Sequence, residues 1–84
     1  MYRYRKPVYS KEQYRIWAEQ GRKNREFAES LYAGVRRGLL EVHEATDRMC
    51  GYLRCLCDMG MITENTRSKM YTDFVAKVLE LETK

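Results

Sequence analysis

Three cysteines and one histidine are the residues of this 84-residue chain best suited to metal binding or nucleophilic catalysis. Cys50, Cys55 and Cys57 are closely spaced, and His43 precedes them. On a helix, His43, Cys50 and Cys57 would be about 10 Å apart in succession, whereas zinc ligands all lie within about 2.3 Å of one ion. The histidine is also too distant to activate a cysteine. The sequence therefore indicates no metal site, no cofactor and no enzymatic activity, and predicts reduced thiols beside a core.

The first nine residues, MYRYRKPVY, combine cations with flat aromatic rings. No acidic residue occurs before Glu12, and Pro7 favours an extended backbone. The cations of such a segment can neutralise phosphates while its tyrosines stack on unpaired bases. The sequence thus predicts an extended basic arm at residues 1–9 that contacts a partner. The contact residues predicted in the arm are Tyr2, Arg3, Tyr4, Arg5, Lys6 and Tyr9.

Two other interpretations of the arm remain open. Tyrosine and arginine are typical anchors of protein interfaces, so the partner of the arm can equally be a protein. In the third interpretation the arm is passive, or it folds back so that Tyr4 and Val8 pack on the first helix.

The charge of the chain is unevenly distributed around a net value of +4. Residues 1–40 carry ten Lys/Arg and four Asp/Glu, whereas residues 41–84 carry six and eight. A basic front half favours a polyanion or an acidic surface as the partner. No apolar run approaches the ~18 residues of a membrane span, and the start lacks the apolar stretch of a signal peptide. We therefore expect a cytoplasmic protein without a membrane partner.

The spacing of apolar residues predicts three helices, at about residues 10–36, 42–59 and 64–82. Short connections between them favour antiparallel neighbours. The predicted fold class is all-α: a small antiparallel three-helix bundle at residues 10–84, with a long first helix and the extended basic arm at residues 1–9.

The helix junctions carry recognisable capping residues. Ser10 begins an S-x-x-Q capping box, and Thr63 is suited to cap the third helix. Segments 38–49 and 60–71 repeat one pattern, in which a glycine follows a helix and two apolar residues precede the next one. Glycine suits the left-handed position at such a helix end. The second segment fits a DNA-reading helix-turn-helix poorly, because Arg67 stands near the place of its inward aliphatic residue.

Each predicted helix has one apolar face, which we expect to form the core. Gly21 and Asn24 lie on the apolar stripe of the first helix and should weaken it, so we expect a kink or a close helix approach near Gly21. The residues of these apolar faces are Tyr14, Trp17, Ala28, Leu31 and Val35 in the first helix, Val42, Ala45, Met49, Leu53 and Leu56 in the second, and Met70, Phe74, Val78 and Leu81 in the third.

The first helix should outreach the others, since it is about 40 Å long and they are nearer 30 Å. Its start would then overhang unless a bound target or a second copy of the chain, in a homodimer, covers it. The contact residues predicted there are Tyr14, Arg15, Trp17 and Arg22. Two alternatives stay open: Trp17 belongs to the core, or the charges form a solvated face of ion pairs such as Arg15–Glu19 and Arg22–Glu26.

The sequence therefore predicts a non-catalytic helical binding protein. Under the first hypothesis, the arm and the start of the first helix bind nucleic acid or a nucleoprotein complex, mostly at backbone phosphates. The alternative is a protein-interaction module without direct nucleic-acid contact. It would act as an inhibitor or adaptor of a larger enzyme, of the kind that phages and mobile elements encode.

Overall fold

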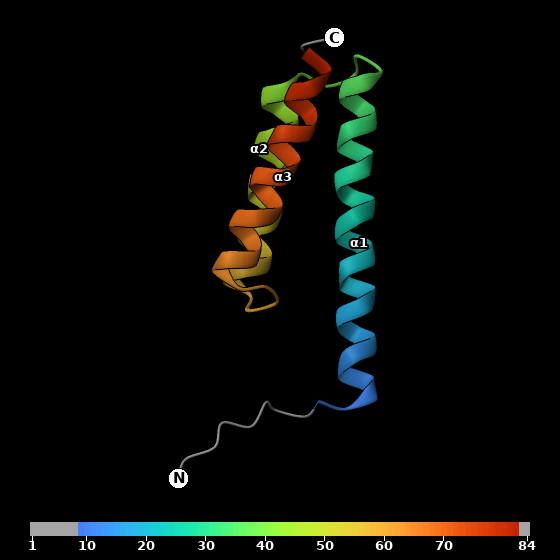
Figure 1. The fold of residues 1–84 in the computed structure, drawn as a ribbon, viewed down its shortest axis with the longest axis vertical. Helices are drawn as coiled ribbons and strands as arrows, with labels where there is room; N and C mark the ends of the chain where they lie inside the picture. Colours follow the sequence, from blue (N-terminus) through green and yellow to red (C-terminus); the bar gives the residue numbers. More distant parts are fainter. Residues whose placement is uncertain (1–8, 83–84) are drawn as a thin grey trace.

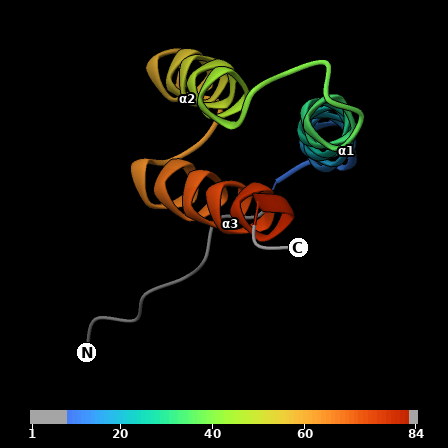
Figure 2. The ribbon, with the colours of Figure 1, turned by 90° about the horizontal axis from the view of Figure 1, so that it is seen from above.

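The computed structural model describes residues 9–82, which form three helices and, within that range, no strand (Figure 1). Helix α1 spans Lys11–Arg36, α2 spans Val42–Asp58 and α3 spans Glu64–Glu82. Consecutive helices run in opposite directions and occupy the corners of a triangle when seen from above (Figure 2). The predicted all-α, three-helix fold is confirmed, and each helix begins and ends at or beside the predicted residue.

The predicted caps begin α1 and α3. The Ser10 hydroxyl accepts a hydrogen bond from the Gln13 amide at 3.1 Å, and the Thr63 hydroxyl accepts one from the Thr66 amide at 3.1 Å. Each bond satisfies a backbone N–H group that has no partner within the helix. Both helices are therefore fixed at the residues where the sequence predicted their start.

The two predicted glycine caps end α1 and α2 in the same way. Gly38 and Gly60 both have a φ of 76°, in the left-handed region that favours glycine. The next amide, that of Leu39 or Met61, donates across the cap to a carbonyl of the preceding helix at 2.9 Å. This is the bond that defines a Schellman motif, and it turns the chain sharply at each end.

The core lies between α2 and α3 and the C-terminal half of α1. The second residue after each capping glycine, Leu40 or Ile62, packs against this core. The buried cluster consists of residues at predicted inward positions: Leu31, Ala45, Met49, Leu53, Phe74 and Val78. The predicted apolar faces of the three helices therefore meet along this part of the molecule.

A polar contact that we did not predict from the sequence joins α1 to α2. Asn24 is 4% exposed, and its Oδ1 accepts hydrogen bonds from the Tyr52 hydroxyl at 2.6 Å and from Gln20 Nε2 at 2.8 Å. The Tyr52 ring also stacks on Phe27, with 4.1 Å between centroids. Asn24 thus anchors α1 where we expected a weak seam, and α1 continues as one helix through Gly21.

The N-terminal part of α1 extends past the turn between α2 and α3 (Figure 1). Helix α1 has 26 residues, whereas α2 has 17 and α3 has 19. Trp17 is 41% exposed in this overhanging part, so it is not a core residue. The structure thus shows the overhang that the helix lengths predicted.

Two glycine substitutions should change stability in opposite directions. Gly60→Ala forces a left-handed backbone on a residue with a side chain, so we expect the free energy of unfolding to fall by about 1–2 kcal/mol. Gly51→Ala, in the middle of α2, should raise it by roughly 0.5–1 kcal/mol, because alanine favours a helix. A Cβ atom at either site would meet no heavy atom within 4 Å, so the two substitutions differ only in the conformational energy of the backbone. Urea denaturation measures both values, and equal effects at the two sites would contradict the cap assignment.

Candidate binding groove

Three aromatic side chains form a cluster at the overhanging end of α1. The ring of Tyr9 lies 4.6 Å from that of Trp17 and 6.1 Å from that of Tyr14, and the Tyr14 and Trp17 centroids are 5.9 Å apart. All three pairs meet edge to face, the favourable arrangement for aromatic quadrupoles. Tyr9, Tyr14 and Trp17 are 43%, 54% and 41% exposed, so this aromatic cluster leaves a large apolar surface in contact with solvent.

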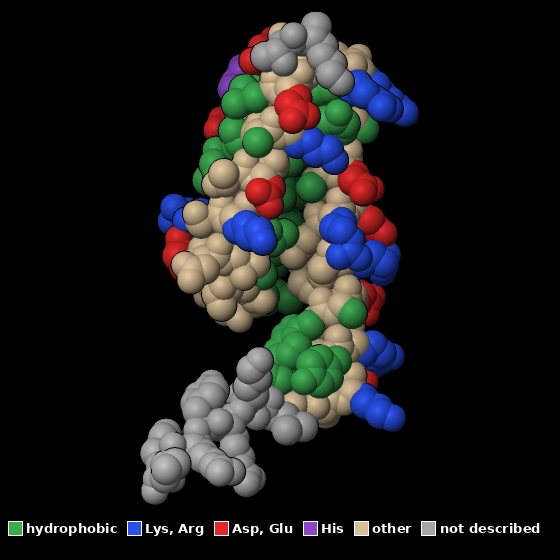
Figure 3. Space-filling view, viewed as in Figure 1, with side chains coloured by type: hydrophobic (Ala, Val, Ile, Leu, Met, Phe, Trp, Pro, Cys, Tyr) green, Lys and Arg blue, Asp and Glu red, His purple; other side chains and the backbone are tan. Residues whose placement is uncertain are grey.

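The aromatic cluster adjoins a groove that opens between α1, the α2–α3 turn and α3. Hydrophobic side chains line the hollow between α1 and α3 and gather at the overhanging end of α1 (Figure 3). The mouth of the groove encloses about 590 Å³. Trp17 belongs both to the aromatic cluster and to the lining of the mouth. The other lining residues are Gln20, Gly21, Asn24, Arg25, Gly60, Met61, Ile62, Thr63, Thr66 and Met70.

The groove continues between α1 and α3 as a smaller hollow of about 220 Å³. Asn24, Arg25 and Met70 line both parts, so the two hollows are contiguous. The smaller hollow is also lined by Ala28, Met49, Asp73, Phe74 and Lys77. We call the two parts together the α1–α3 groove.

The charged residues at the start of α1 pair with one another. Arg15 lies 2.6 Å from Glu12, and Arg22 lies 2.7 Å from Glu26 and 3.6 Å from Glu19. The predicted Arg22–Glu26 pair is confirmed. The predicted Arg15–Glu19 pair is wrong, since Arg15 turns to Glu12 in the first turn of the helix instead. These pairs offset the charge of two arginines that the sequence assigned to partner contact.

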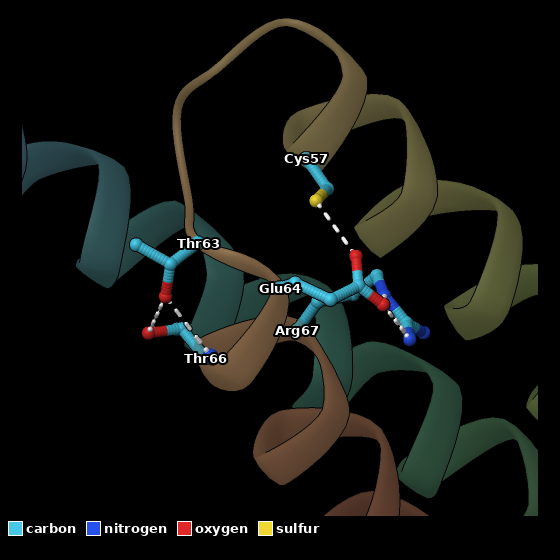
Figure 4. A network of polar contacts seen from close by, with 5 residues as sticks. All are labelled: Cys57, Thr63, Glu64, Thr66 and Arg67. Atoms are coloured by element: carbon cyan, nitrogen blue, oxygen red, sulfur yellow. Dashed lines mark hydrogen bonds and ion pairs between the residues drawn. The ribbon is translucent and has the colours of Figure 1, made fainter.

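A small polar network ties the end of α2 to the start of α3 (Figure 4). The Cys57 thiol donates to Glu64 Oε2 at 3.2 Å, and the Arg67 guanidinium donates to Glu64 Oε1. The hydrogen bond to Glu64 is the main reason why the pKa of Cys57 is raised, and the hydrogen bond from Arg67 is the main reason why the pKa of Glu64 is lowered. Cys57 therefore stays a protonated thiol at neutral pH, and the network steadies the turn at the mouth of the groove.

The structure keeps His43 far from Cys57, two of the residues first considered for metal binding or nucleophilic catalysis. His43 lies at the exposed start of α2, 3.8 Å from the Glu41 carboxylate, whereas Cys57 lies near the other end of that helix. Within residues 9–82, no group of three or more His, Cys, Asp or Glu side chains is placed to hold a metal ion. No helix in this range is long and apolar enough to cross a membrane.

The structure brings together only some of the predicted contact residues. Tyr9, Tyr14 and Trp17 converge in the aromatic cluster, whereas Arg15 and Arg22 are absent from the groove lining. The rest of the predicted contact set lies outside the described residues: Tyr2, Arg3, Tyr4, Arg5 and Lys6.

Sequence reasoning missed the α3 wall of the groove and the two cations that line it, Arg25 on α1 and Lys77 on α3. Met70 packs against the core as expected, but it is only half-buried and also lines the groove. Asn24 was the one sequence signal of a polar contact between helices, because a polar residue on an apolar stripe often has a dedicated hydrogen-bond partner.

The Cys57–Glu64 bond predicts how fast this thiol reacts. The hydrogen bond to Glu64 and the negative charge of Glu64 both raise the pKa of Cys57 above its usual value of 9.0. Replacing Glu64 by Gln weakens this hydrogen bond and removes the charge, so more thiolate should form near pH 8. We expect iodoacetamide to modify Cys57 several-fold faster in Glu64→Gln than in the parent protein, as followed by mass spectrometry of peptides. Cys55, which is exposed, supplies the internal control and should react at an unchanged rate. Equal rates for Cys57 in both proteins would contradict the assigned bond.

Comparison with known proteins identifies no relative of this chain. No protein-family model matches its sequence, and no curated protein and no solved structure matches it either. The function of the groove therefore has to follow from its own residues and geometry.

Proposed function

We propose that the protein is a non-catalytic binding protein that docks a protein partner on the aromatic cluster and the α1–α3 groove. The observation that carries the proposal is the position of Trp17, which stands in the aromatic cluster and also forms one side of the groove mouth. A partner seated in the groove would therefore also cover exposed aromatic surface. By occupying a surface in this way, the protein would act as an adaptor or an inhibitor of a larger protein.

The chemistry of the aromatic cluster supports a protein partner. Tryptophan and tyrosine are enriched among the few residues that supply most of the binding energy at protein interfaces. The edge-to-face contacts hold the three rings against one another before binding, at about 0.5–1.5 kcal/mol for each pair. Rings that are already ordered lose less side-chain entropy when a partner binds. Met61 and Met70 add flexible apolar surface that can adapt to the partner.

The charges at the start of α1 also support a protein partner. Arg15 and Arg22 have carboxylate neighbours within their own helix, so a phosphate would have to displace Glu12, Glu19 or Glu26 from them. Exposed pairs of this kind contribute only about 0–1 kcal/mol each, yet they lower the local positive potential. The start of α1 therefore offers mainly apolar surface to a partner.

Binding to nucleic acid or a nucleoprotein complex is the second candidate. The observation that favours it is the place of Tyr9, which is in the aromatic cluster and lies three residues after Lys6, the last of the basic residues Arg3, Arg5 and Lys6. Exposed rings beside a run of cations are the usual elements of a single-strand binding surface, where bases stack and phosphates pair with cations. Under this proposal the arm would supply the charge and the aromatic cluster would supply the stacking.

Selection of ligands from a displayed library of random peptides tests the first proposal. We expect the full-length protein to enrich a defined set of apolar peptides. Trp17→Ala and Tyr14→Ala should each weaken their binding by tenfold or more, since anchor residues contribute about 2 kcal/mol or more. Ile16→Ala is the matched control: Ile16 is 46% exposed on the same helix but lies outside both the aromatic cluster and the groove, so binding should not change.

The folded state of these variants has to be checked at the same time. A fully buried tryptophan would cost about 3–5 kcal/mol on truncation, whereas Trp17 is 41% exposed and should cost far less. Thermal unfolding followed by circular dichroism measures this cost. Peptides that bind Trp17→Ala as well as the parent protein would rule out the groove as the binding surface.

Fluorescence anisotropy with labelled single-stranded DNA and RNA tests the second candidate. If Arg3, Arg5 and Lys6 contact three phosphates, affinity should fall about twentyfold between roughly 50 and 200 mM salt. A triple Arg3→Ser, Arg5→Ser, Lys6→Ser variant should lose this salt dependence. The variant Arg36→Ser, Arg37→Ser, Lys69→Ser removes the same charge elsewhere and should keep it. No binding at the lower salt concentration would exclude free single-stranded nucleic acid as the partner.

A further inference from the structure

We propose that the α1–α3 groove receives one amphipathic helix of a partner protein, with acidic residues beside the apolar face of that helix. This inference rests on the proposed function and specifies the chemistry of the partner. It follows from the length of the groove, the size of the side chains on its two walls and the charges along its edges.

The groove has the length of a short helix. Its lining runs from Trp17 to Ala28 on α1 and from Thr66 to Lys77 on α3. Each of these stretches is about 16 Å long at 1.5 Å per residue, which corresponds to three turns of an incoming helix. A helix has all of its backbone groups hydrogen-bonded within itself, so it can enter an apolar groove without leaving buried N–H or C=O groups unpaired.

The walls of the groove suit helix packing. On the α1 side the side chains are small at Gly21 and Ala28. Opposite them, Met70 of α3 and Met61 of the α2–α3 turn are large and partly exposed, whereas Phe74 is buried in the core. Small residues allow a neighbouring helix to approach to about 8–10 Å between axes, and the larger side chains opposite fill the spaces between its residues. The incoming helix would lie beside α1 and α3 as the fourth helix of a bundle. Its apolar anchors should therefore follow the i, i+3, i+4, i+7 spacing of helix-in-groove ligands.

Two cations stand on opposite walls of the groove. Arg25 belongs to α1 and Lys77 to α3, and no ion pair among residues 9–82 includes either of them. Lys77 is held instead over the ring of Tyr32, with its Nζ 4.6 Å from the ring centroid. Among residues 9–82, Asp73 is the only one with a carboxylate that lines the groove. The edges thus carry an excess of positive charge, which an acidic residue on the partner helix would complement.

The charge of the chain argues against a second copy as the occupant. The start of α1 carries Lys11 and Arg15 against Glu12 and Glu19, but helix α1 as a whole has six Lys/Arg and four Asp/Glu. Placing this helix in the groove of another copy would bring further cations towards Arg25 and Lys77. A partner with an acidic helix avoids that repulsion.

Two designed peptides of about 14 residues test the inference with the full-length protein. Both carry leucine at i, i+3, i+4 and i+7, one with glutamate and the other with lysine at the positions beside this apolar face. The intrinsic fluorescence of Trp17, the only tryptophan in the chain, reports entry into the groove. We expect the glutamate peptide to bind about tenfold tighter than the lysine peptide.

Charge exchange decides whether Arg25 and Lys77 cause this preference. In the double variant Arg25→Glu, Lys77→Glu the preference should reverse, so that the lysine peptide binds tighter. The control Lys23→Glu, Arg48→Glu changes the net charge equally at exposed residues outside the groove and should leave the preference unchanged. Retention of the glutamate preference in the Arg25→Glu, Lys77→Glu variant would overturn the inference.

Three further outcomes would also overturn it. One is that neither peptide binds. Another is that an oligothymidylate displaces the bound peptide, which would show that nucleic acid binds in the groove. The last is that sedimentation shows a dimer that the glutamate peptide dissociates, which would show that a second copy of the chain occupies the groove. If the designed peptides fail while library-selected peptides still depend on Trp17, the proposed function stands and only the acidic-helix partner is excluded.

Discussion

The length of α1 is the constraint on which the rest of the structure depends. Its 26 residues span about 39 Å, whereas the 17 residues of α2 and the 19 of α3 span about 26 and 29 Å. The shorter pair can cover only part of the apolar stripe of α1. The stripe is therefore buried at Leu31 and exposed at Trp17. Gly60 and Thr63 fix where α2 ends and α3 begins, so the turn between them cannot reach the overhang.

The groove is a second consequence of the same geometry. Asn24, Tyr52 and Phe27 hold α1 against α2, and Lys77 over the Tyr32 ring joins α3 to α1 farther along. Towards Trp17 no comparable contact among the described residues closes the space between α1 and α3. The larger hollow of the groove thus lies beside the aromatic cluster, and the two features form one continuous surface through Trp17. This continuity is why we assign both to a single partner.

Much of the fold could be predicted from the sequence because local rules determine it. Glycine at a left-handed helix end and a hydroxyl at a helix start act over a few residues, so Gly38, Gly60 and Thr63 were identified correctly. The overhang followed from helix lengths alone. The groove could not be predicted, because Arg25 and Lys77 come to line one hollow only when α1 and α3 pack together. Asn24 was misjudged for the same reason, since its partner Tyr52 is on another helix.

Acrylamide quenching of the fluorescence of Trp17 tests most directly the claim that the end of α1 is an uncovered binding surface. The chain has a single tryptophan, so the signal comes from one side chain. In the free protein we predict a quenching constant that is a substantial fraction of that of N-acetyltryptophanamide, in line with the 41% exposure of Trp17, and that does not change with protein concentration. Strong protection of Trp17 in the dilute free protein would contradict the account, because the surface would then already be covered.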